Sequence, residues 1–303
     1  MNHSPIATAE QWRASPRRQT PDEVPVSGAL MCPPDHFDVI DIRNAHMSAH
    51  VGQVDEAAAR SQWNSLADAI DGMGLDVHLL DPPKGLVDAV FTANPSLVSV
   101  DDCGQPVAII GRMDHPDRRP ESELHRSRLR QLGIRCLDID AATAGIWEGN
   151  GDTLKHPGLS LLWCGVGMRS HLECHLEVGR MTGHELAILH LPDPCFYHLD
   201  TALAMLREDC VAVVRSAFDP GGIELLESAF DQLIEVDEVE AREKLAGNLW
   251  CPDGLHVLMP AGAPITADRL SKHGFAVTEI ETGEFLKSGG SVFCLRQEIR
   301  EPV

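Results

Sequence analysis

Apolar and polar positions along the chain repeat in one order of elements. A hydrophobic strand is followed by a turn, a second strand, an amphipathic helix and a closing strand. The pattern predicts a strand pair over 97–111 (LVSVDDCGQPVAIIG), a helix over 121–133 and a strand over 134–139. Apolar residues recur at i, i+3 and i+4 in the helices, which end at glycine (Gly74, Gly133, Gly183, Gly274), as helix C-termini often do.

The same order recurs along the rest of the chain. The predicted strand, helix and strand cover 159–167, 170–183 and 184–191, then 209–216, 221–233 and 234–236, then 253–260, 266–274 and 275–280. The N-terminal part supplies a strand at 37–40 (FDVI), a helix at 54–74 and a strand at 77–80, and 292–295 (VFCL) is expected to complete that unit. Copies begin roughly 45–55 residues apart, a period that indicates repeat architecture.

About five ββαβ-like units favour an α/β fold closed into a ring over an open sheet, since a ring leaves no free edge. Residues just past a strand in each unit would then face one central cavity. The alternative is an ordinary α/β sandwich with chance spacing. We expect residues 1–25 to form a polar N-terminal arm and 26–303 to form one domain.

The composition and charge of the chain limit the binding partners that we expect. The 303 residues are 43% hydrophobic and carry a net charge of −21, with 46 acidic against 25 basic residues. Such a surface repels phosphate backbones and anionic lipids, so neither nucleic acid nor a membrane is an expected partner. It weakly favours a cationic small molecule.

The cysteines indicate a reducing compartment. The chain has nine, an odd number, with no CxxC pair, and several lie in apolar runs. We therefore expect reduced thiols and a cytoplasmic protein. The N-terminus lacks the apolar segment of a secretory signal, and no apolar run approaches the ~18–20 residues of a membrane span. Exposed helices on a ring favour a homodimer.

Four polar stretches fall in different units: FTANP (91–95), WEGNGD (147–152), FYHLDT (196–201) and SGGSVFC (288–294). Cys294 follows two glycines, which permit tight backbone near a ligand. A nucleophilic cysteine needs a thiolate, favoured by a nearby histidine such as His198. The alternative for Cys294 is a buried apolar thiol.

Carboxylates accompany these groups. Glu148 lies between Trp147 and a glycine, which suits a desolvated carboxylate that binds a cation or transfers protons, although a turn or helix cap would use it equally. His198 and Asp200 share one face if they lie on a strand, so both would enter one cavity. A turn in which Asp200 caps the following segment is the alternative.

A competing cluster suggests zinc. His171, Cys174 and His175 would share one helix face, with Cys164 on the preceding strand. No second paired set completes the usual zinc signature, so this interpretation is the weaker one.

Taken in order, FTAN, EGNGD, FYHLDT and GGSVFC resemble the guanidino-group-modifying, or amidinotransferase, superfamily from about Met31 to Cys294. Its members include arginine deiminase, dimethylarginine dimethylaminohydrolase, the amidinotransferases and the arginine dihydrolase branch. The resemblance implies a five-bladed α/β propeller of ββαβ units with pseudo-fivefold symmetry. It also implies a hydrolase of linear amidines that needs no metal or cofactor.

The resemblance also assigns roles to single residues. Cys294 matches the nucleophile, which forms a covalent thiouronium intermediate, and His198 matches the general acid/base. Glu148 and Asp200 match carboxylates that bind the guanidinium, and Glu148 also counts among the catalytic residues. Asn94 stands where deiminases and dimethylarginine hydrolases carry aspartate.

Arginines are implied at the far end of the substrate. Arg169 matches a residue that holds the substrate α-carboxylate. Arg119 is a second candidate for substrate binding, and Arg118 fits the same place.

Three departures shape the expected activity. FTAN replaces FTRD or FVED, EGNGD is one residue longer than EGGD, and NAHM (44–47) stands in place of NPWM. The first two look like the arginine dihydrolase branch, which implies hydrolysis of arginine to ornithine, carbon dioxide and ammonia. Dimethylarginine hydrolysis and amidino transfer are the enzymatic alternatives, and a binding protein on the same scaffold is the non-enzymatic one.

Overall fold

The computed structural model describes residues 4–14, 16–20, 24–82, 84–101 and 104–300. Their strands form five small sheets. The strands are β1 (Gly28–Met31), β2 (Asp76–Leu79) and β14 (Gln297–Ile299); β3 (Ser96–Val100), β4 (Pro106–Ile110) and β5 (Arg135–Asp138); β6 (Thr153–Lys155), β7 (Leu161–Val166) and β8 (Glu185–His190); β9 (Leu203–Arg207), β10 (Cys210–Val213) and β11 (Gln232–Glu235); β12 (His256–Pro260) and β13 (Ala276–Ile280).

Four of the sheets share one pairing pattern. The central strand, β1, β4, β7 or β10, pairs antiparallel with one neighbour and parallel with the other. In the fifth sheet β12 pairs parallel with β13, and a bridge from Trp250 to Leu258 supplies the antiparallel side. The repeating order expected from the sequence is therefore present in an α/β fold.

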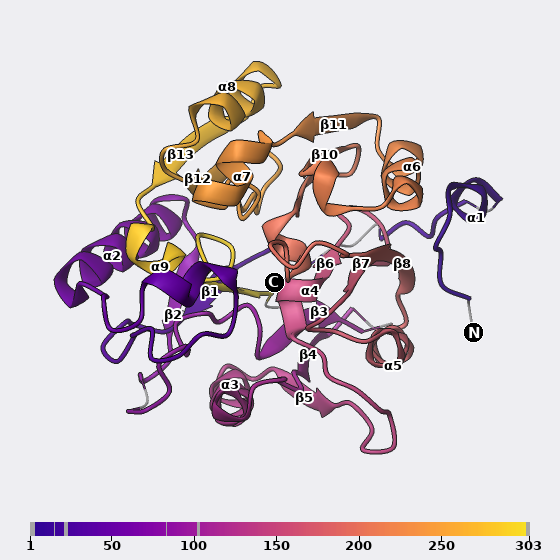
Figure 1. Cartoon of the computed structure of the whole chain (residues 1–303). Helices are drawn as coiled ribbons and strands as arrows, with labels where there is room; N and C mark the ends of the chain where they lie inside the picture. Colours follow the sequence, from indigo (N-terminus) through magenta and orange to yellow (C-terminus); the bar gives the residue numbers. More distant parts are fainter. Residues whose placement is uncertain (1–3, 15, 21–23, 83, 102–103, 301–303) are drawn as a thin grey trace.

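One amphipathic helix crosses over between the two parallel strands of each sheet. These helices are α2 (Glu56–Gly72), α3 (Arg119–Gln131), α5 (Leu172–Thr182), α6 (Pro220–Ala229) and α8 (Pro264–Lys272). Figure 1 shows them around the outside, with the strands between them and the middle of the molecule, where the short α4 (Gly149–Asp152) lies. Their apolar faces cover the sheets, and the main apolar cluster contains residues of all these helices except α3 and α5.

The strand predicted at 37–40 is wrong. The strand of the first sheet is β1, nine residues earlier, and residues 37–40 have no regular structure. Gly28 explains the position, because a Cβ there would lie 2.4 Å from the carbonyl oxygen of Asp76 on β2. Pro33 and Pro34 follow β1 after Cys32 and lack the N–H groups that would extend the strand.

The strand predicted at 292–295 is also wrong. These residues form a turn, in which the Leu295 N–H donates to the Ser291 carbonyl, and β14 begins only at Gln297. The unit is still completed as expected, because β14 pairs with β1. The apolar run is buried in the core without pairing to a strand, so its hydrophobicity alone did not identify its conformation. The helix predicted over 221–233 is shorter than expected: α6 ends at Ala229, and the backbone of Phe230 is extended.

The described part of the expected N-terminal arm is docked on the sheets. Ile6 forms a parallel bridge to Ala187 of β8 and is buried. α1 (Ala9–Ala14) packs against α6, and Trp12 stacks on Trp163 with ring centroids 5.7 Å apart. Because residues 1–25 are mostly polar, the sequence did not indicate these few apolar contacts.

The remaining helices are short. They are α7 (Glu238–Lys244) and α9 (Gly283–Leu286), with 3-10 turns η1 (Ala45–Ala49), η2 (Pro116–Arg118), η3 (Leu199–Thr201) and η4 (Arg215–Ala217). Among the described residues, no helix combines the length and apolar character needed to cross a bilayer.

Trp12→Ala should destabilise the protein. The indole stacks on Trp163, and the Arg17 guanidinium lies 5.2 Å from the centre of the Trp12 ring. Losing these contacts should lower the free energy of unfolding by about 2 kcal/mol. Urea denaturation measures this change, with Glu10→Ala on the exposed face of α1 as the control. Equal stability of the two variants would mean that the docked segment contributes nothing.

Candidate active site

Cys294 is held by two neighbours in a buried turn. Its thiol donates to Oδ2 of Asp200 at 3.2 Å, and the Asn248 side-chain amide donates to its sulfur at 3.1 Å. The Cys294 N–H in turn donates to the Asn248 side-chain carbonyl at 3.2 Å. Only 2% of Cys294 is exposed, and burial together with the charge of Asp200 raises the pKa of this thiol well above its usual range. The thiol is therefore protonated in this arrangement.

Asp200 is a buried acid with unused hydrogen-bonding capacity. It is 0% exposed, and burial raises its pKa to about 7, although the Cys294 hydrogen bond and the charge of Arg296 oppose the rise. Its second oxygen, Oδ1, has no hydrogen-bond partner among the described residues. Buried polar atoms are almost always paired, so Oδ1 is a position for a donor supplied by a ligand.

His198 and Glu148 form a second buried pair. The Nε2 of His198 lies 2.7 Å from Oε2 of Glu148. Burial by itself raises the pKa of Glu148, but the hydrogen bond and charge of His198, with Arg169 and Arg118, bring it down to about 2. Glu148 is thus ionised and fixes the tautomer that carries the proton on Nε2. The Nδ1 atom of His198 is left to exchange protons.

Glu148 has little room for another partner. Besides His198, its Oε2 faces Arg169 at 3.4 Å, and its Oε1 accepts from the Asp114 N–H at 3.1 Å. The geometry therefore makes Glu148 a partner of His198, while Asp200 carries the unpaired carboxylate oxygen.

Asn94 connects the histidine to an arginine. Its side-chain NH₂ lies 3.5 Å from Nδ1 of His198, and its side-chain carbonyl accepts from Arg118 at 3.2 Å. Arg118 also pairs with Glu121 at 2.8 Å and donates to the Phe91 carbonyl. Asn94 thus lies within the same constellation as the other candidates.

The structure distinguishes the three candidate arginines. Arg169 lines the cavity, lies over the Tyr197 ring at 5.2 Å and donates to the Arg43 carbonyl. Arg118 lines the cavity as well. Arg119 does not, because it starts α3 and its guanidinium donates to the carbonyls of Met113 and Asp114. The alternative that the sequence left open, Arg118, is the one placed at the site.

The cavity between these groups is small. It has a volume of about 20 Å³, room for about one water molecule, and is lined by Cys294, His198, Asn94 and the two arginines, with Arg43, Asn44 and Asp88 at the side of η1. A larger ligand must displace side chains at its rim.

Two glycines allow the segments to meet this closely. A Cβ on Gly290 would lie 2.2 Å from Cε1 of Phe91, and one on Gly151 would lie 2.4 Å from Nδ2 of Asn94. The SGG and EGNGD stretches therefore need glycine because each packs against the FTAN turn. This packing brings Cys294, Glu148 and Asn94 into one site.

The Cys/His zinc cluster that the sequence offered as the weaker alternative does not assemble among the described residues. His175 is bound to the Gly165 carbonyl and to Thr153, and the Cys174 thiol faces the Ala144 carbonyl. In the part of the chain that the structure covers, these residues do not gather into a group of metal-ligand atoms.

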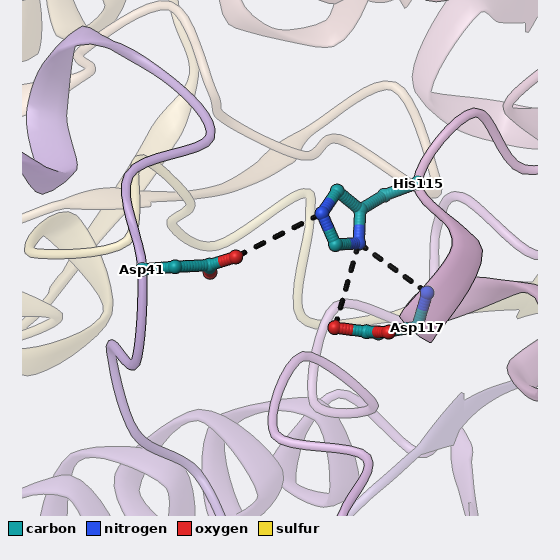
Figure 2. Close-up of side chains that lie close together, drawn as sticks. All are labelled: Asp41, His115 and Asp117. Carbon is teal, nitrogen blue, oxygen red and sulfur yellow. Dashed lines mark hydrogen bonds and ion pairs between the residues drawn. The ribbon is translucent and has the colours of Figure 1, made fainter.

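Asp41, His115 and Asp117 do lie close together near the rim (Figure 2). Asp41 faces Nε2 of His115 at 3.8 Å, whereas Asp117 faces Nδ1 at 3.9 Å, on the other edge of the ring. Arg43 contacts both carboxylates and also pairs with Asp88. This arrangement suits an ion-pair network around Arg43 better than one metal ion.

Several residues at the site were given no role from the sequence, although Tyr197 and Asn44 lie within the stretches FYHLDT and NAHM. Asn248 lies in an unremarkable loop, yet it positions the thiol. Tyr197 donates to the Gly289 carbonyl at 2.6 Å, and Asn44 donates to the Ser288 carbonyl at 2.9 Å. Such roles depend on tertiary contacts between distant segments.

Known proteins resemble the chain along most of its length, although no family model matches it. It is 34% identical over 299 residues to N(G),N(G)-dimethylarginine dimethylaminohydrolase of Mycobacterium tuberculosis, covering 99% of this chain and 93% of the relative. It is 31% identical over 276 residues to the bifunctional arginine dihydrolase/ornithine cyclodeaminase ArgZ of Synechocystis, covering 90% of this chain and 38% of ArgZ.

Solved structures of the same two kinds of enzyme are also similar to this chain. The N-terminal domain of ArgZ, a cyanobacterial arginine dihydrolase, bound to its substrate, matches with a TM-score of 0.84 and 30% identity over 90% of this chain and 98% of that one. A dimethylarginine dimethylaminohydrolase adduct with S-methyl-L-thiocitrulline matches with a TM-score of 0.75 and 25% identity over 90% and 100%.

The α/β fold and the extent of these matches define a hydrolase that acts on C–N bonds of guanidino groups. The chain belongs to the dimethylarginine dimethylaminohydrolase family within the guanidino-group-modifying superfamily, which also contains the arginine dihydrolases.

Asp200→Asn should make Cys294 more reactive toward iodoacetamide at neutral pH. The substitution removes the negative charge that raises the pKa of the thiol, so the thiolate fraction at a given pH increases. We expect alkylation of Cys294, followed by mass spectrometry, to reach its midpoint at lower pH. Asp88→Asn, which removes a carboxylate that lines the cavity and pairs with Arg43, is the control. An unchanged or higher midpoint in Asp200→Asn would contradict this account of the site.

Proposed function

We propose that the protein hydrolyses the guanidinium group of arginine or a closely related compound through covalent catalysis by Cys294, with an arginine dihydrolase-like outcome. The observation that carries this proposal is the free Oδ1 of buried Asp200 beside the Cys294 thiol. A guanidinium ion is planar, always charged and rich in N–H donors, so it satisfies this oxygen and neutralises the carboxylate at once.

Substrate charge also activates the nucleophile. A thiolate beside an ionised Asp200 in a buried site is unfavourable, which agrees with the raised pKa of Cys294. A bound guanidinium adds a positive charge next to both groups and lowers that pKa. The nucleophile is thus formed when its target is present.

The first half of the reaction follows from this geometry. The Cys294 thiol passes its proton to Nδ1 of His198, and the thiolate attacks the central guanidinium carbon to form a tetrahedral adduct. His198, held by Glu148, then gives that proton from Nδ1 to a terminal nitrogen, whose C–N bond breaks, so that ammonia departs and a thiouronium remains on Cys294. His198 then removes a proton from water, which attacks the same carbon and releases citrulline and the thiol.

Asn94 supports a second round. An aspartate at this position favours the cationic guanidinium over the neutral ureido group of citrulline. An amide both donates and accepts, so it suits a ureido group. A second attack by Cys294 then gives ornithine, carbon dioxide and a second ammonia, and the net reaction consumes two waters.

The far end of the substrate is assigned to Arg169. Arg118 is already occupied by Glu121 at 2.8 Å, by Asn94 and by the Phe91 carbonyl, whereas the ion pair of Arg169 with Glu148 is longer, at 3.4 Å, and its other hydrogen bond is to the Arg43 carbonyl at 3.2 Å. Exchanging these for a substrate α-carboxylate is the smaller rearrangement. It also opens the rim of the cavity.

Dimethylarginine hydrolysis is the second candidate. The relative that is 34% identical carries that name, and the same groups would release dimethylamine instead of ammonia. Asn94 favours the arginine dihydrolase reaction. Hydrolysis of dimethylarginine stops at citrulline, so that reaction does not need an amide that binds the ureido group for a second step.

Further features belong to this proposal. The shared pairing of the sheets supports a five-bladed α/β propeller of ββαβ units over 26–303. The free thiols of the described cysteines support a cytoplasmic enzyme. A homodimer remains a prediction.

Incubation with L-arginine should yield ornithine and two ammonia per arginine, measured by mass spectrometry and an ammonia assay. Cys294→Ser should abolish turnover, since it removes the nucleophile, while its fold is checked by circular dichroism. His198→Ala should lower kcat by about 10²–10⁴-fold. Failure of the native protein to consume arginine, with consumption of dimethylarginine, would replace the first candidate by the second.

Asn94→Asp should convert the enzyme into one that stops at citrulline. The new carboxylate lies next to Arg118 and His198 and still suits a cation, but it repels the lone pairs of a ureido oxygen. Citrulline should accumulate, with arginine consumption retained. The matched control is Asn64→Asp on the exposed face of α2. Ornithine as the main product of Asn94→Asp would contradict the role given to the amide.

A further inference from the structure

Arg296 is a buried cation two residues beyond the nucleophile. Its side chain is 0% exposed, and its guanidinium lies 3.5 Å from the ring centre of Phe293 and 4.7 Å from that of Trp250. Arginine is rarely buried in this way unless it is paired. Neither the sequence motifs nor the proposed chemistry gives this side chain a task.

Its pairing is incomplete. Nη1 donates to Oδ1 of Asn150 at 2.9 Å, and Nη2 lies 3.7 Å from Oε1 of Glu298. Within the described residues, Nε and Nη2 have no hydrogen-bond partner. Glu298 is shared, because it also accepts from Trp250 and Arg300. A buried charge with so few partners is costly for stability, so its retention needs a reason.

Asn150 is the residue that makes EGNGD longer than EGGD. Its N–H donates to the Ala93 carbonyl at 2.9 Å, and its side-chain NH₂ donates to the Thr153 carbonyl at 2.9 Å. The remaining side-chain oxygen accepts from Arg296. The Arg296–Asn150 contact therefore joins the turn that carries Glu148 to the turn that carries Cys294.

This link spans the two halves of the site. One half is the Cys294–Asp200–Asn248 group, and the other is the Glu148–His198 pair. The reaction needs the sulfur at a near-attack distance of about 3–3.5 Å from the guanidinium carbon, and the histidine nitrogen next to the nitrogen that leaves that carbon.

Other charges surround the pair. The charged or titratable groups around Cys294 and Arg296 are Asp200, Tyr197 and His198 from the segment 197–200, Glu148 before α4, Glu298 and Arg300 from β14 and the residue after it, and Arg118 and Arg169 at the cavity. Asp200 and Glu298 are the carboxylates that interact with Arg296 through charge. Arg296 is thus a buried cation two residues from Cys294 in the chain, and it is not among the residues that line the cavity.

We infer that Arg296, anchored by Asn150, is a positioning residue for this reaction, which sets Cys294 against the Glu148–His198 pair and supports negative charge on Cys294 and Asp200. The inference rests on the proposed function for its consequence on turnover. Its effect on the thiol is independent of the substrate. The inference has two measurable consequences. The charge of Arg296 should affect the pH at which Cys294 is alkylated, and its hydrogen bond to Asn150 should affect kcat.

The charge is tested by alkylation of Cys294 with iodoacetamide across a pH series. Arg296→Met removes the cation, Arg296→Lys keeps it, and Arg300→Met removes a neighbouring arginine that donates to the Val24 carbonyl and Glu298. We expect Arg296→Met to raise the alkylation midpoint by about one pH unit, and the other two variants to stay near the native value. Equal midpoints in Arg296→Met and Arg300→Met would overturn the electrostatic role.

The hydrogen bond is tested with Asn150→Ser, which keeps the cation but shortens its acceptor. We expect kcat to fall at least about tenfold, KM to change little and the alkylation midpoint to stay native, as a misplaced acid/base pair predicts. Native kcat in this variant would overturn the positioning role. If thermal unfolding shows that Arg296→Met does not fold, Arg296→Gln, which also removes the charge but keeps a side-chain donor for Asn150, takes its place in the alkylation series with the same expected shift.

The alkylation result separates this inference from the proposed function. If the native protein does not consume arginine but the midpoint still shifts in Arg296→Met, the substrate assignment fails and the role of Arg296 stands. If arginine is consumed and the midpoint does not shift, the electrostatic part of this inference fails and the proposed function stands.

Discussion

The hydrogen bond from the Cys294 thiol to Asp200 is the constraint on which the site depends. Both groups are buried, both become negative on ionisation, and they lie 3.2 Å apart. In a low-dielectric environment two such charges disfavour each other, so without a ligand the pair retains a proton. A cation that reaches the free oxygen of Asp200 relieves this conflict. The chemistry of the site is therefore directed toward cationic substrates before shape is considered.

The fold serves this arrangement by bringing loops from four sheets together. Asn94 precedes β3, Glu148 precedes α4 and β6, Asp200 lies in η3 before β9, and Cys294 lies in the turn before β14. In each case the residue comes just before the strand that pairs antiparallel with the central strand of its sheet, at the same point of the repeat. β14 pairs with β1, which ties the segment that carries Cys294 to the first sheet.

Much of this could be predicted from the sequence, for identifiable reasons. The helices α2, α3, α5, α6 and α8 have clear amphipathic patterns, and the central strands β4, β7 and β10 are continuous apolar runs. The order of the four polar stretches identified Cys294, His198, Glu148, Asp200 and Asn94 as neighbours. These properties are local, and the sequence carries them directly.

The rest depends on tertiary contacts. The apolar run at 292–295 is a buried turn, since core packing and strand pairing demand the same hydrophobicity. Arg118 and Arg119 are adjacent, and only the η2 turn decides which one faces the cavity. Asn248 and Arg296 act on Cys294 or its turn across contacts that no spacing rule anticipates.

The most direct test of the account is to trap the covalent intermediate. Native protein mixed with L-arginine, quenched in acid within milliseconds to seconds and measured by intact-protein and peptide mass spectrometry, should carry an adduct on Cys294 equal to arginine minus ammonia. The adduct should be absent from Cys294→Ser. Rapid product formation with no adduct on Cys294 at any quench time, or the same adduct on another residue, would contradict the account.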